Sequence, residues 1–340
     1  MPQNRAGVLC VGDINADINI DRRAVKTVTQ SAEDLMRGGS VGNKGMLCPG
    51  GTAANTAVGL GRLGTRVAIA GLIGADGFGQ FSIDHLEKDG VDTSHLVRLP
   101  GGFTMVTVNI FDQNGDRELS FAFPEQGAAF TLLTPDHLPD ALLAQFSVFY
   151  TTGVPILFDP TRSTLIDCMH RCHKLGVTVA FDLNMRVEAH GYTDDIRRAF
   201  EQAAAASDIL FGSATQELPI LTGCTDWVQA AQKLRRSCRV VVSKNGAAGA
   251  AVFGPGESCQ MPAFPVSVKD TLGAGDAFNA GFLTAYVQNK SLRDCLLWGS
   301  AAAGYSIQFT GSRTTPNSRQ LAAFMAEHAD IAAQIGPVAV

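Results

Sequence analysis

The sequence lacks the features that mark several classes of protein. Charged residues make up only 17% of its 340 positions, the formal net charge is −5, and no stretch is basic, which argues against a nucleic-acid partner. No apolar run approaches the roughly 18 residues of a membrane-spanning helix. The first residues also lack the apolar segment of a secretory signal. We therefore expect a cytoplasmic protein that does not bind a membrane.

Eight cysteines are scattered along the chain without the spacing of a disulfide framework, so we expect reduced thiols. The segment from Cys168 to His173 looks like a metal site, because two of its cysteines lie one helical turn apart. Zinc requires about four ligands, and two of them would have to come from elsewhere. We interpret this segment as the polar surface of a helix that ends before Gly176.

Hydrophobic residues make up 46% of the chain, which is enough for a sizeable core. Strand and helix signals alternate along most of it, and this predicts an α/β fold with a mainly parallel sheet and helices on both faces. The expected strands are 8–12, 67–72, 148–151, 177–182, 209–211 and 240–243. The expected helices are 53–63, 78–89, 163–175, 194–206, 226–237 and 292–307.

Two stretches interrupt this rhythm. Residues 15–48 are polar and rich in glycine, and residues 103–123 alternate around Asn114-Gly115, a strong hairpin signal. We expect the excursions 13–48 and 101–123 to pack together as a small β lid. The α/β core would then consist of 1–12, 49–100 and 124–340, because no linker or repeat marks a separately folding domain.

The run from Asp270 to Phe278 is the most informative segment. Apolar residues continue after it at helical spacing, so we expect the glycine turn at 273–275 to open a helix whose unpaired amides attract anions. Residues 263–268 are expected to form a strand before it, which would place the turn at a strand-to-helix junction. Asp276 then suits a base that takes a proton from a hydroxyl attacking a phosphoryl group. The alternative is a first-turn carboxylate favoured only by the helix dipole.

The segment Asp270-Thr271-Leu272-Gly273-Ala274-Gly275-Asp276-Ala277-Phe278 resembles the C-terminal signature of the ribokinase-like (PfkB-type) carbohydrate kinases. The segment that begins at Gly50-Gly51 and includes Asn55 resembles the N-terminal signature of that family. The resemblance implies a ribokinase-like three-layer sandwich with a β lid. It also implies a catalytic base at Asp276, an anion hole at Gly273, Ala274 and Gly275, and sugar contacts at Gly50, Gly51 and Asn55.

Two further segments match polar positions of the family. Asn15 and Asp17 follow the first expected strand, and residues two apart point to the same side of an extended chain. The family's matching Asn and Asp hold the sugar. Asp182, Asn184 and Arg186 resemble the Asp-x-Asn-x-Arg of fructokinases and 2-keto-3-deoxygluconate kinases. This implies a substrate contact for Asn184 and a catalytic role for Arg186, which would offset the developing phosphoryl charge.

The resemblance also implies the cofactors ATP and Mg²⁺, with K⁺ as a further expectation. Glu217 matches the family's Asn-x-x-Glu, which organises Mg²⁺ through water, although Ala214 replaces the Asn. Asp270 is expected to form a monovalent-cation site with the turn at 310–312. The expected ATP contacts are Lys244, Gly246, Gly249 and Ser300.

Other functions and several substrates stay open. Gly59 to Gly64 matches G-x-G-x-x-G, but these glycines end a helix, which argues against a dinucleotide-binding oxidoreductase. A nucleoside kinase of the same fold and a non-catalytic sugar-binding protein remain alternatives.

Two features disfavour ribose as the substrate. Thr52 lies where some ribokinases carry Lys, and no acidic residue is present at 151–153. The Asp182 element favours fructose or 2-keto-3-deoxygluconate, and Arg117 would suit an acid. In this family the lid often pairs with the lid of a second copy, so a homodimer through the lid is a further expectation.

Overall fold

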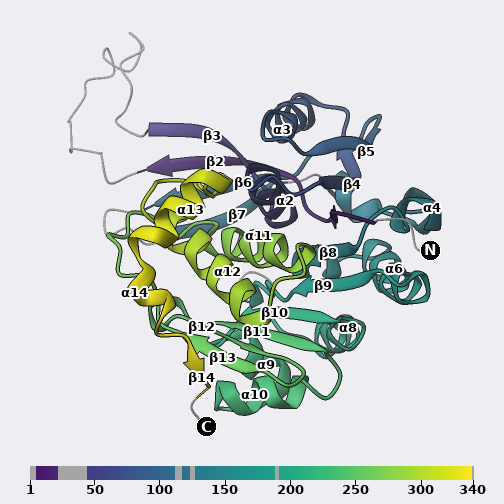
Figure 1. Ribbon diagram of the computed structural model, residues 1–340. Helices are drawn as coiled ribbons and strands as arrows, with labels where there is room; N and C mark the ends of the chain where they lie inside the picture. The colour runs from purple at the N-terminus through teal and green to yellow at the C-terminus, as the bar shows by residue number, and fades with distance from the viewer. Residues whose placement is uncertain (1–4, 22–43, 112–116, 123–126, 188–190, 339–340) are drawn as a thin grey trace.

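The computed structural model describes residues 5–21, 44–111, 117–122, 127–187 and 191–338. Within these ranges the main sheet has ten strands, in the order β14-β13-β12-β11-β10-β9-β8-β1-β4-β5 (Figure 1). Pairing is parallel from β5 to β11 and antiparallel from β11 to β14. The strands are β1 (Val8–Val11), β4 (Val67–Gly74), β5 (Asp92–Leu99), β8 (Val148–Thr152), β9 (Thr178–Asp182), β10 (Ile209–Ser213), β11 (Val240–Lys244), β12 (Ala250–Phe253), β13 (Ser258–Met261) and β14 (Gly336–Pro337).

The chain reverses its direction across the sheet at β1. From β1 it proceeds to β4 and β5 on one side, and it then continues from β8 to β11 on the other. In open α/β sheets, ligands bind in the crevice at the carboxyl ends of strands beside such a switch point. Residues that follow β1 and β8 therefore lie where a binding site is expected.

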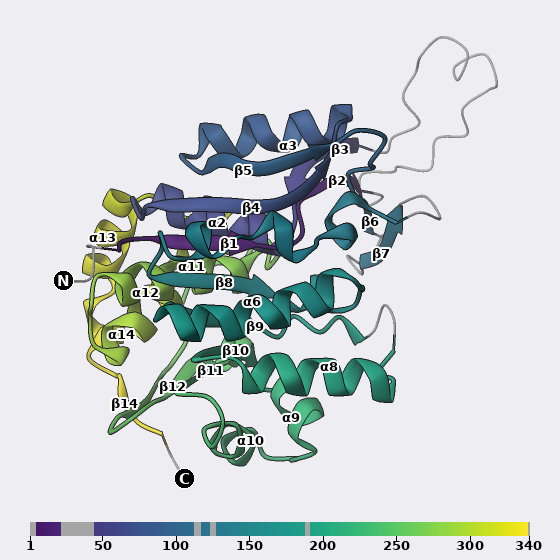
Figure 2. The ribbon, with the colours of Figure 1, turned by 90° about the vertical axis from the view of Figure 1, so that its right-hand side faces the viewer.

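Helices cover both faces of the main sheet (Figure 2). One face carries α2 (Thr52–Arg62), α3 (Gly77–Lys88), α11 (Ala274–Val287), α12 (Leu292–Ser306), α13 (Ser318–Glu327) and α14 (Ala329–Ala332). The other carries α4 (Asp140–Leu143), α5 (Gly153–Ile156), α6 (Thr161–Leu175), α8 (Asp194–Ala205), α9 (Glu217–Thr222) and α10 (Trp227–Leu234). The expected three-layer α/β fold is confirmed. In the described part of the chain, no helix has the length and apolar character needed to cross a membrane.

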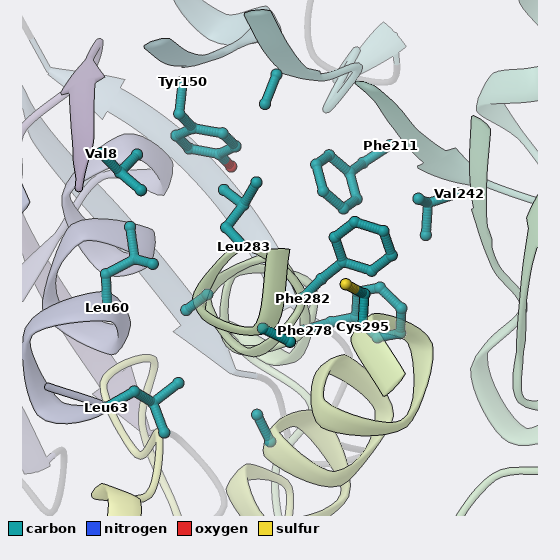
Figure 3. Packing of buried hydrophobic residues seen from close by; sticks show 14 of the residues in the cluster. Val8, Leu60, Leu63, Tyr150, Phe211, Val242, Phe278, Phe282, Leu283 and Cys295 are labelled. Carbon is teal, nitrogen blue, oxygen red and sulfur yellow. The ribbon is translucent and has the colours of Figure 1, made fainter. Parts of the chain in front are cut away.

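Helix α11 lies at the centre of one hydrophobic core (Figure 3). Phe282 of α11 meets Phe211 of β10 edge-on, with ring centroids 5.2 Å apart. Gly281 permits α11 and α12 to approach closely, because an added Cβ would lie 2.4 Å from the Trp298 carbonyl oxygen. This packing holds the first turn of α11 in place against the sheet.

A smaller sheet with the order β3-β2-β6-β7 lies beside the main sheet (Figure 1). Strand β2 (Asn15–Asp21) pairs antiparallel with β3 (Lys44–Gly50) and parallel with β6 (Val106–Phe111), which pairs antiparallel with β7 (Arg117–Ala122). These strands come from the two excursions predicted to form a lid, although β3 continues to Gly50, beyond the expected boundary at residue 48. The predicted Asn114-Gly115 turn lies outside the described residues, and movement of this sheet as a lid stays a prediction.

The strand predicted at 263–268 is wrong. Pro265 has no amide hydrogen for a strand ladder, and the Val266 amide instead bonds to the Phe264 carbonyl oxygen at 3.0 Å. The Phe264 ring packs on Phe324 of α13, with ring centroids 5.1 Å apart. The turn that opens α11 therefore follows an irregular segment rather than a strand. Strand β5 was not predicted, because it lacks a buried apolar run.

Candidate active site

The turn at 273–275 opens helix α11, as the sequence predicts. Gly273 is the N-cap residue with a φ of 76°, and an added Cβ would lie 2.3 Å from the Ser312 carbonyl oxygen. Only glycine fits this position. The Ala274 amide donates to the Thr271 carbonyl oxygen at 3.2 Å within the turn. Because first-turn amides have no acceptor inside their helix, the next amide, that of Gly275, is the better placed to bind an anion.

Asp276 is the third residue of α11, and its side chain is buried. The side-chain amide of Asn55, on α2, donates to Asp276 Oδ2 at 3.0 Å. Burial raises the pKa of Asp276 to about 7, even though the bond from Asn55 lowers it. A carboxyl group with a pKa near neutrality can accept a proton in turnover at neutral pH, which suits a general base.

A cavity of about 70 Å³ lies between the small sheet and the start of α11. We call it the acceptor cavity. Its lining includes most of the residues predicted to bind a sugar or to act in catalysis: Asn15, Asp17, Gly51, Asn55, Arg186, Gly273 and Asp276. Asn15 Nδ2 donates to Thr107 Oγ1 at 3.3 Å. The described residues provide no hydrogen-bond donor for the buried Oδ1 atoms of Asn15 and Asn109.

Gly50 is not part of this lining. It lies against Asp17, and an added Cβ would come within 2.3 Å of the Asp17 carboxylate oxygens. Glycine at this position therefore allows the carboxylate to lie over the backbone at the end of β3. Gly50 therefore packs against the Asp17 carboxylate and does not itself line the acceptor cavity.

A second cavity, of about 780 Å³, lies on the other side of the α11 turn. We call it the nucleotide cavity. Its lining includes all four predicted ATP contacts, Lys244, Gly246, Gly249 and Ser300, together with apolar residues such as Phe264 and Val266. Ser300 Oγ is buried and has no hydrogen-bond partner in the described part of the chain. A polar group on a ligand would satisfy it.

The two cavities meet at the α11 turn. Gly273 and Asp276 line the acceptor cavity, whereas Ala274 and Gly275 line the nucleotide cavity. A hydroxyl group in the first cavity and an anion in the second would therefore approach each other across four consecutive residues. This arrangement places a buried carboxyl group on one side and a helix N-terminus on the other.

Lys244 connects the nucleotide cavity to the main sheet. Its Nζ lies 3.0 and 3.1 Å from the two carboxylate oxygens of Asp182, which is buried. Asn279 of α11 donates to Asp182 Oδ2 at 2.7 Å and to the Tyr150 hydroxyl at 3.0 Å. An added Cβ on Gly275 would lie 3.4 Å from Lys244 Nζ. The Lys244 ammonium therefore borders the turn that is expected to bind an anion.

The polar residues after β9 do not continue the strand. Asn184 and Arg186 have φ values of 31° and 49°, in the left-handed region that residues other than glycine rarely adopt. The backbone therefore leaves the extended conformation after Asp182, where β9 ends. Arg186 nevertheless lines the acceptor cavity with Asp276, and Asn184 is not among the residues that line either cavity.

Glu217 joins the segment after β9 to the end of β10 through both of its carboxylate oxygens. Oε1 accepts from the Met185 amide and Oε2 from the Ser213 amide, each at 2.8 Å. Burial, and then the nearby Asp182 carboxylate, raise the pKa of Glu217. Ala214, at the position of the family's Asn, is buried. The described residues contain no group of three His, Cys, Asp or Glu side chains able to hold a metal ion, so the Mg²⁺ role of Glu217 stays a prediction.

Asp270 lies next to the turn with which it was predicted to form a cation site. Its Oδ1 accepts from the Leu272 amide and its Oδ2 from the Gly311 amide, each at 2.9 Å. These bonds connect the segment before α11 to the 310–312 turn. The cation itself stays a prediction.

Two residues that sequence reasoning missed contribute to the site. Asp13 accepts from the Thr52 amide and the Thr52 hydroxyl, each at 2.8 Å, at the start of α2. Its position directly after a predicted strand was the available signal. Arg313 donates to Asn55 Oδ1 and to the Gly50 carbonyl oxygen, each at 3.0 Å. No local pattern marks Arg313, because these partners lie 258 and 263 residues away in the sequence.

The two cysteines of the suspected metal cluster face the protein interior. Cys168 and Cys172 are buried in the core around α6 with Leu165 and Met169, and the expectation that they lie on a polar helix surface is wrong. Burial raises the pKa of each thiol to about 12. Both are therefore protonated structural thiols rather than reactive thiolates.

Comparisons with known proteins identify the family to which this chain is similar. The family model "pfkB family carbohydrate kinase" matches residues 5–319. Aminoimidazole riboside kinase of Salmonella typhimurium is 31% identical over 293 residues, which cover 84% of this chain and 90% of that protein. A 5-dehydro-2-deoxygluconokinase of Lacticaseibacillus casei is 28% identical, covering 81% and 86%. The crystal structure of Salmonella enterica aminoimidazole riboside kinase with aminoimidazole riboside and an ATP analogue matches with a TM-score of 0.75 at 26% identity, covering 94% of this chain and 99% of that one.

Proposed function

This chain belongs to the pfkB family of carbohydrate kinases, and on that basis we propose that Asp276 is the general base for phosphoryl transfer from ATP to a hydroxyl of a sugar or related ligand. The observation that carries the proposal is the α11 turn between the two cavities. Asp276 lines the smaller cavity and Gly275 the larger one. A buried carboxyl group and an anion-binding helix N-terminus are thus placed on the two sides of the reacting groups.

In the proposed mechanism, Asp276 takes the proton of the acceptor hydroxyl as the hydroxyl oxygen attacks the terminal phosphorus of ATP. The bond from that phosphorus to the bridging oxygen breaks, and ADP leaves with the bonding electrons. Bonding from the Gly275 amide and the charge of Arg186 offset the negative charge that develops on the phosphoryl oxygens. Lys244, next to the turn, holds the phosphates on the nucleotide side. Exclusion of water by the small sheet would limit hydrolysis of ATP.

The residues present fit a Mg²⁺ ion held mainly by water and phosphate. Mg²⁺ usually takes only one or two protein carboxylates, and Asp182 and Glu217 lie close enough for Asp182 to raise the pKa of Glu217. These two residues would hold the ion through water. When bound, Mg²⁺ neutralises part of the phosphate charge. A monovalent cation would lie at Asp270 and the 310–312 turn.

The acceptor cavity favours an uncharged ligand that is rich in hydroxyl groups. The buried oxygens Asn15 Oδ1 and Asn109 Oδ1 require donors, and a polyol supplies them. Among the described lining residues, Arg186 is the one cation, whereas Asp13, Asp17 and Asp276 are acidic. A neutral sugar such as fructose fits this lining better than a sugar acid. A riboside is the second candidate, because the relative that is 31% identical is named for one.

The decisive experiment is an ATP-consumption assay with separate panels of neutral sugars, ribosides and sugar acids. We expect turnover with a neutral sugar or riboside, and we expect Asp276→Asn to lower it at least about 100-fold while binding of ATP persists. A protein that binds these ligands but transfers no phosphate would support the non-catalytic alternative.

A homodimer through the small sheet is a further part of the proposal. Met46 and Leu47 of β3 are 53% and 44% exposed, so this strand presents apolar side chains that a second copy of the chain would cover. Light scattering would detect the dimer, and Leu47→Glu should convert it to a monomer.

A further inference from the structure

Arg313 lies at the end of a chain of hydrogen bonds that leads to Asp276. Arg313 Nε donates to Asn55 Oδ1 at 3.0 Å, and Asn55 Nδ2 donates to Asp276 Oδ2, also at 3.0 Å. The Arg313 guanidinium also donates through Nη2 to the Gly50 carbonyl oxygen at 3.0 Å. These bonds connect the turn after α12, helix α2 and the first turn of α11.

The guanidinium fixes the orientation of the Asn55 amide. A side-chain amide has an acceptor end and a donor end, whereas a guanidinium only donates. The Asn55 oxygen must therefore face Arg313, and its amino group must face Asp276. In the reversed orientation, two donors would meet at Arg313 and two acceptors would meet at Asp276. Both contacts would be repulsive.

The position of Arg313 is itself well defined. Arg62 Nη1 donates to the Arg313 carbonyl oxygen at 2.5 Å, and Arg62 forms an ion pair with Asp89 at 2.7 Å. Gly311 lies in the same turn as Arg313, and its amide donates to Asp270. Arg313 Nη1 is buried and has no acceptor in the described part of the chain. Burial of an unpaired donor costs free energy, so the surrounding contacts hold this side chain in the interior rather than at the surface.

We propose that Arg313 is a positioning residue for phosphoryl transfer: it orients Asn55, which holds one carboxylate oxygen of Asp276 and leaves the other for the acceptor hydroxyl. The proposal rests on Asp276 being the base in the proposed function. A purely structural Arg313 would only tie the 311–315 turn to β3. The two roles differ in what the loss of the guanidinium does to Asp276.

Loss of Arg313 should make Asp276 harder to deprotonate. The charged groups that act on Asp276 come from several elements: Asp182 of β9, Lys244 of β11, Arg186 after β9, and Arg313 itself. Removal of Arg313 takes away one of the positive charges and also leaves the Asn55 amide free to turn. Both changes disfavour the carboxylate, so the pKa of Asp276 should rise.

The test compares Arg313→Met with Arg62→Met, which weakens the same turn without touching Asn55. In Arg313→Met we expect kcat to fall roughly 10- to 100-fold, the scale of one lost charge-assisted hydrogen bond. We also expect the acid limb of the pH–rate profile to move to higher pH, with little change in the KM for ATP. Arg62→Met should lower thermal stability and move the pH profile much less than Arg313→Met does. Arg313→Lys keeps the charge and one donor and should recover part of kcat and most of the profile.

A second readout needs no turnover. A ¹³C NMR titration of the Asp276 carboxyl group in the ligand-free protein should show a higher pKa in Arg313→Met than in the wild type, and a smaller change in Arg313→Lys. If Arg313→Met leaves both the pH–rate profile and the Asp276 titration unchanged, the positioning role is overturned. If instead the wild type phosphorylates no acceptor while the titration shifts as expected, the proposed function fails and the hydrogen-bond relay stands. If Arg313→Met does not fold, the same titration in Arg313→Lys decides, because an unchanged midpoint together with an unchanged kcat would contradict the relay.

Discussion

The Lys244 ammonium group lies 3.0 and 3.1 Å from the two carboxylate oxygens of Asp182, between the end of the sheet and the nucleotide cavity. The pair is almost enclosed, with 18% of the Lys244 side chain and 4% of the Asp182 side chain exposed. Removal of one partner leaves the other charge uncompensated. We expect Lys244→Met to raise the KM for ATP and to lower the free energy of unfolding by about 3 kcal/mol.

The double variant Lys244→Met, Asp182→Asn separates the two effects. Because it removes the uncompensated carboxylate, it should regain most of the lost stability, as measured by denaturant unfolding. It should not regain affinity for ATP. Recovery of ATP affinity in the double variant would show that Lys244 acts only as a structural counter-ion.

Asp276→Asn should lower kcat by roughly 10²- to 10⁴-fold, the usual contribution of a general base. The amide is close in size to the carboxylate, so we expect the fold to persist. Asp136→Asn, at an exposed position, is the matched control and should keep full activity. Near-normal turnover of Asp276→Asn would remove Asp276 from the chemistry.

The pH dependence of this enzyme should reflect the buried Asp276. Its pKa of about 7 in the folded protein exceeds the ordinary value of 3.8, so the folded state binds this proton more tightly than the unfolded state does. The contribution of Asp276 to the free energy of unfolding should therefore fall as the pH rises from about 4 to about 7, and stay constant above that. Catalysis requires the deprotonated carboxylate of Asp276, so kcat/KM should fall about tenfold per pH unit below pH 7.

The check is to measure both quantities in the wild type and in Asp276→Asn. The difference in stability between the two proteins should favour the Asn variant more at pH 8 than at pH 4. A constant difference across this range would mean that Asp276 does not titrate between the two pH values.

Glu217→Gln tests whether this residue is structural or holds Mg²⁺. Its two oxygens accept from the Met185 and Ser213 amides, and Gln would turn a donor toward one of those amides. We expect a loss of about 1–3 kcal/mol in the free energy of unfolding. If activity instead recovers fully at high Mg²⁺ concentration with stability unchanged, the residue serves the ion alone.

Asn109→Val should weaken binding of a neutral acceptor. Asn109 Oδ1 is a buried acceptor on the cavity wall, and its Nδ2 donates to Asn19 Oδ1 at 2.9 Å. We expect the KM for the acceptor to rise roughly 5- to 100-fold, the scale of one hydrogen bond to a ligand. Asn19→Val breaks the same Asn19–Asn109 bond from a residue that does not line the cavity, and it should change the KM much less.

The sequence predicted the alternation of strands and helices because apolar spacing is a local property. The prediction was wrong at residues 263–268. These residues are apolar because they pack on α13 and line the nucleotide cavity, and they do not form a strand. The α11 turn could be predicted because its glycines, helix start and carboxylate are consecutive. The hydrogen bonds of Asn55 could not be predicted, because its partners Asp276 and Arg313 lie 221 and 258 residues away in the sequence. Periodicity says nothing about such distant contacts.

The parallel pairing of β2 with β6 has a consequence for the order of folding. These strands come from excursions on either side of β4 and β5, so their register depends on the position of those core strands. The small sheet cannot fix this register until β4 and β5 are in place, so we expect β2 and β6 to pair late. We therefore expect the acceptor cavity to be completed last during folding. In hydrogen exchange, amides of β2 and β6 should open at lower free energy than those of β1 and β8, which are buried inside the ten-stranded sheet and end beside the same cavity.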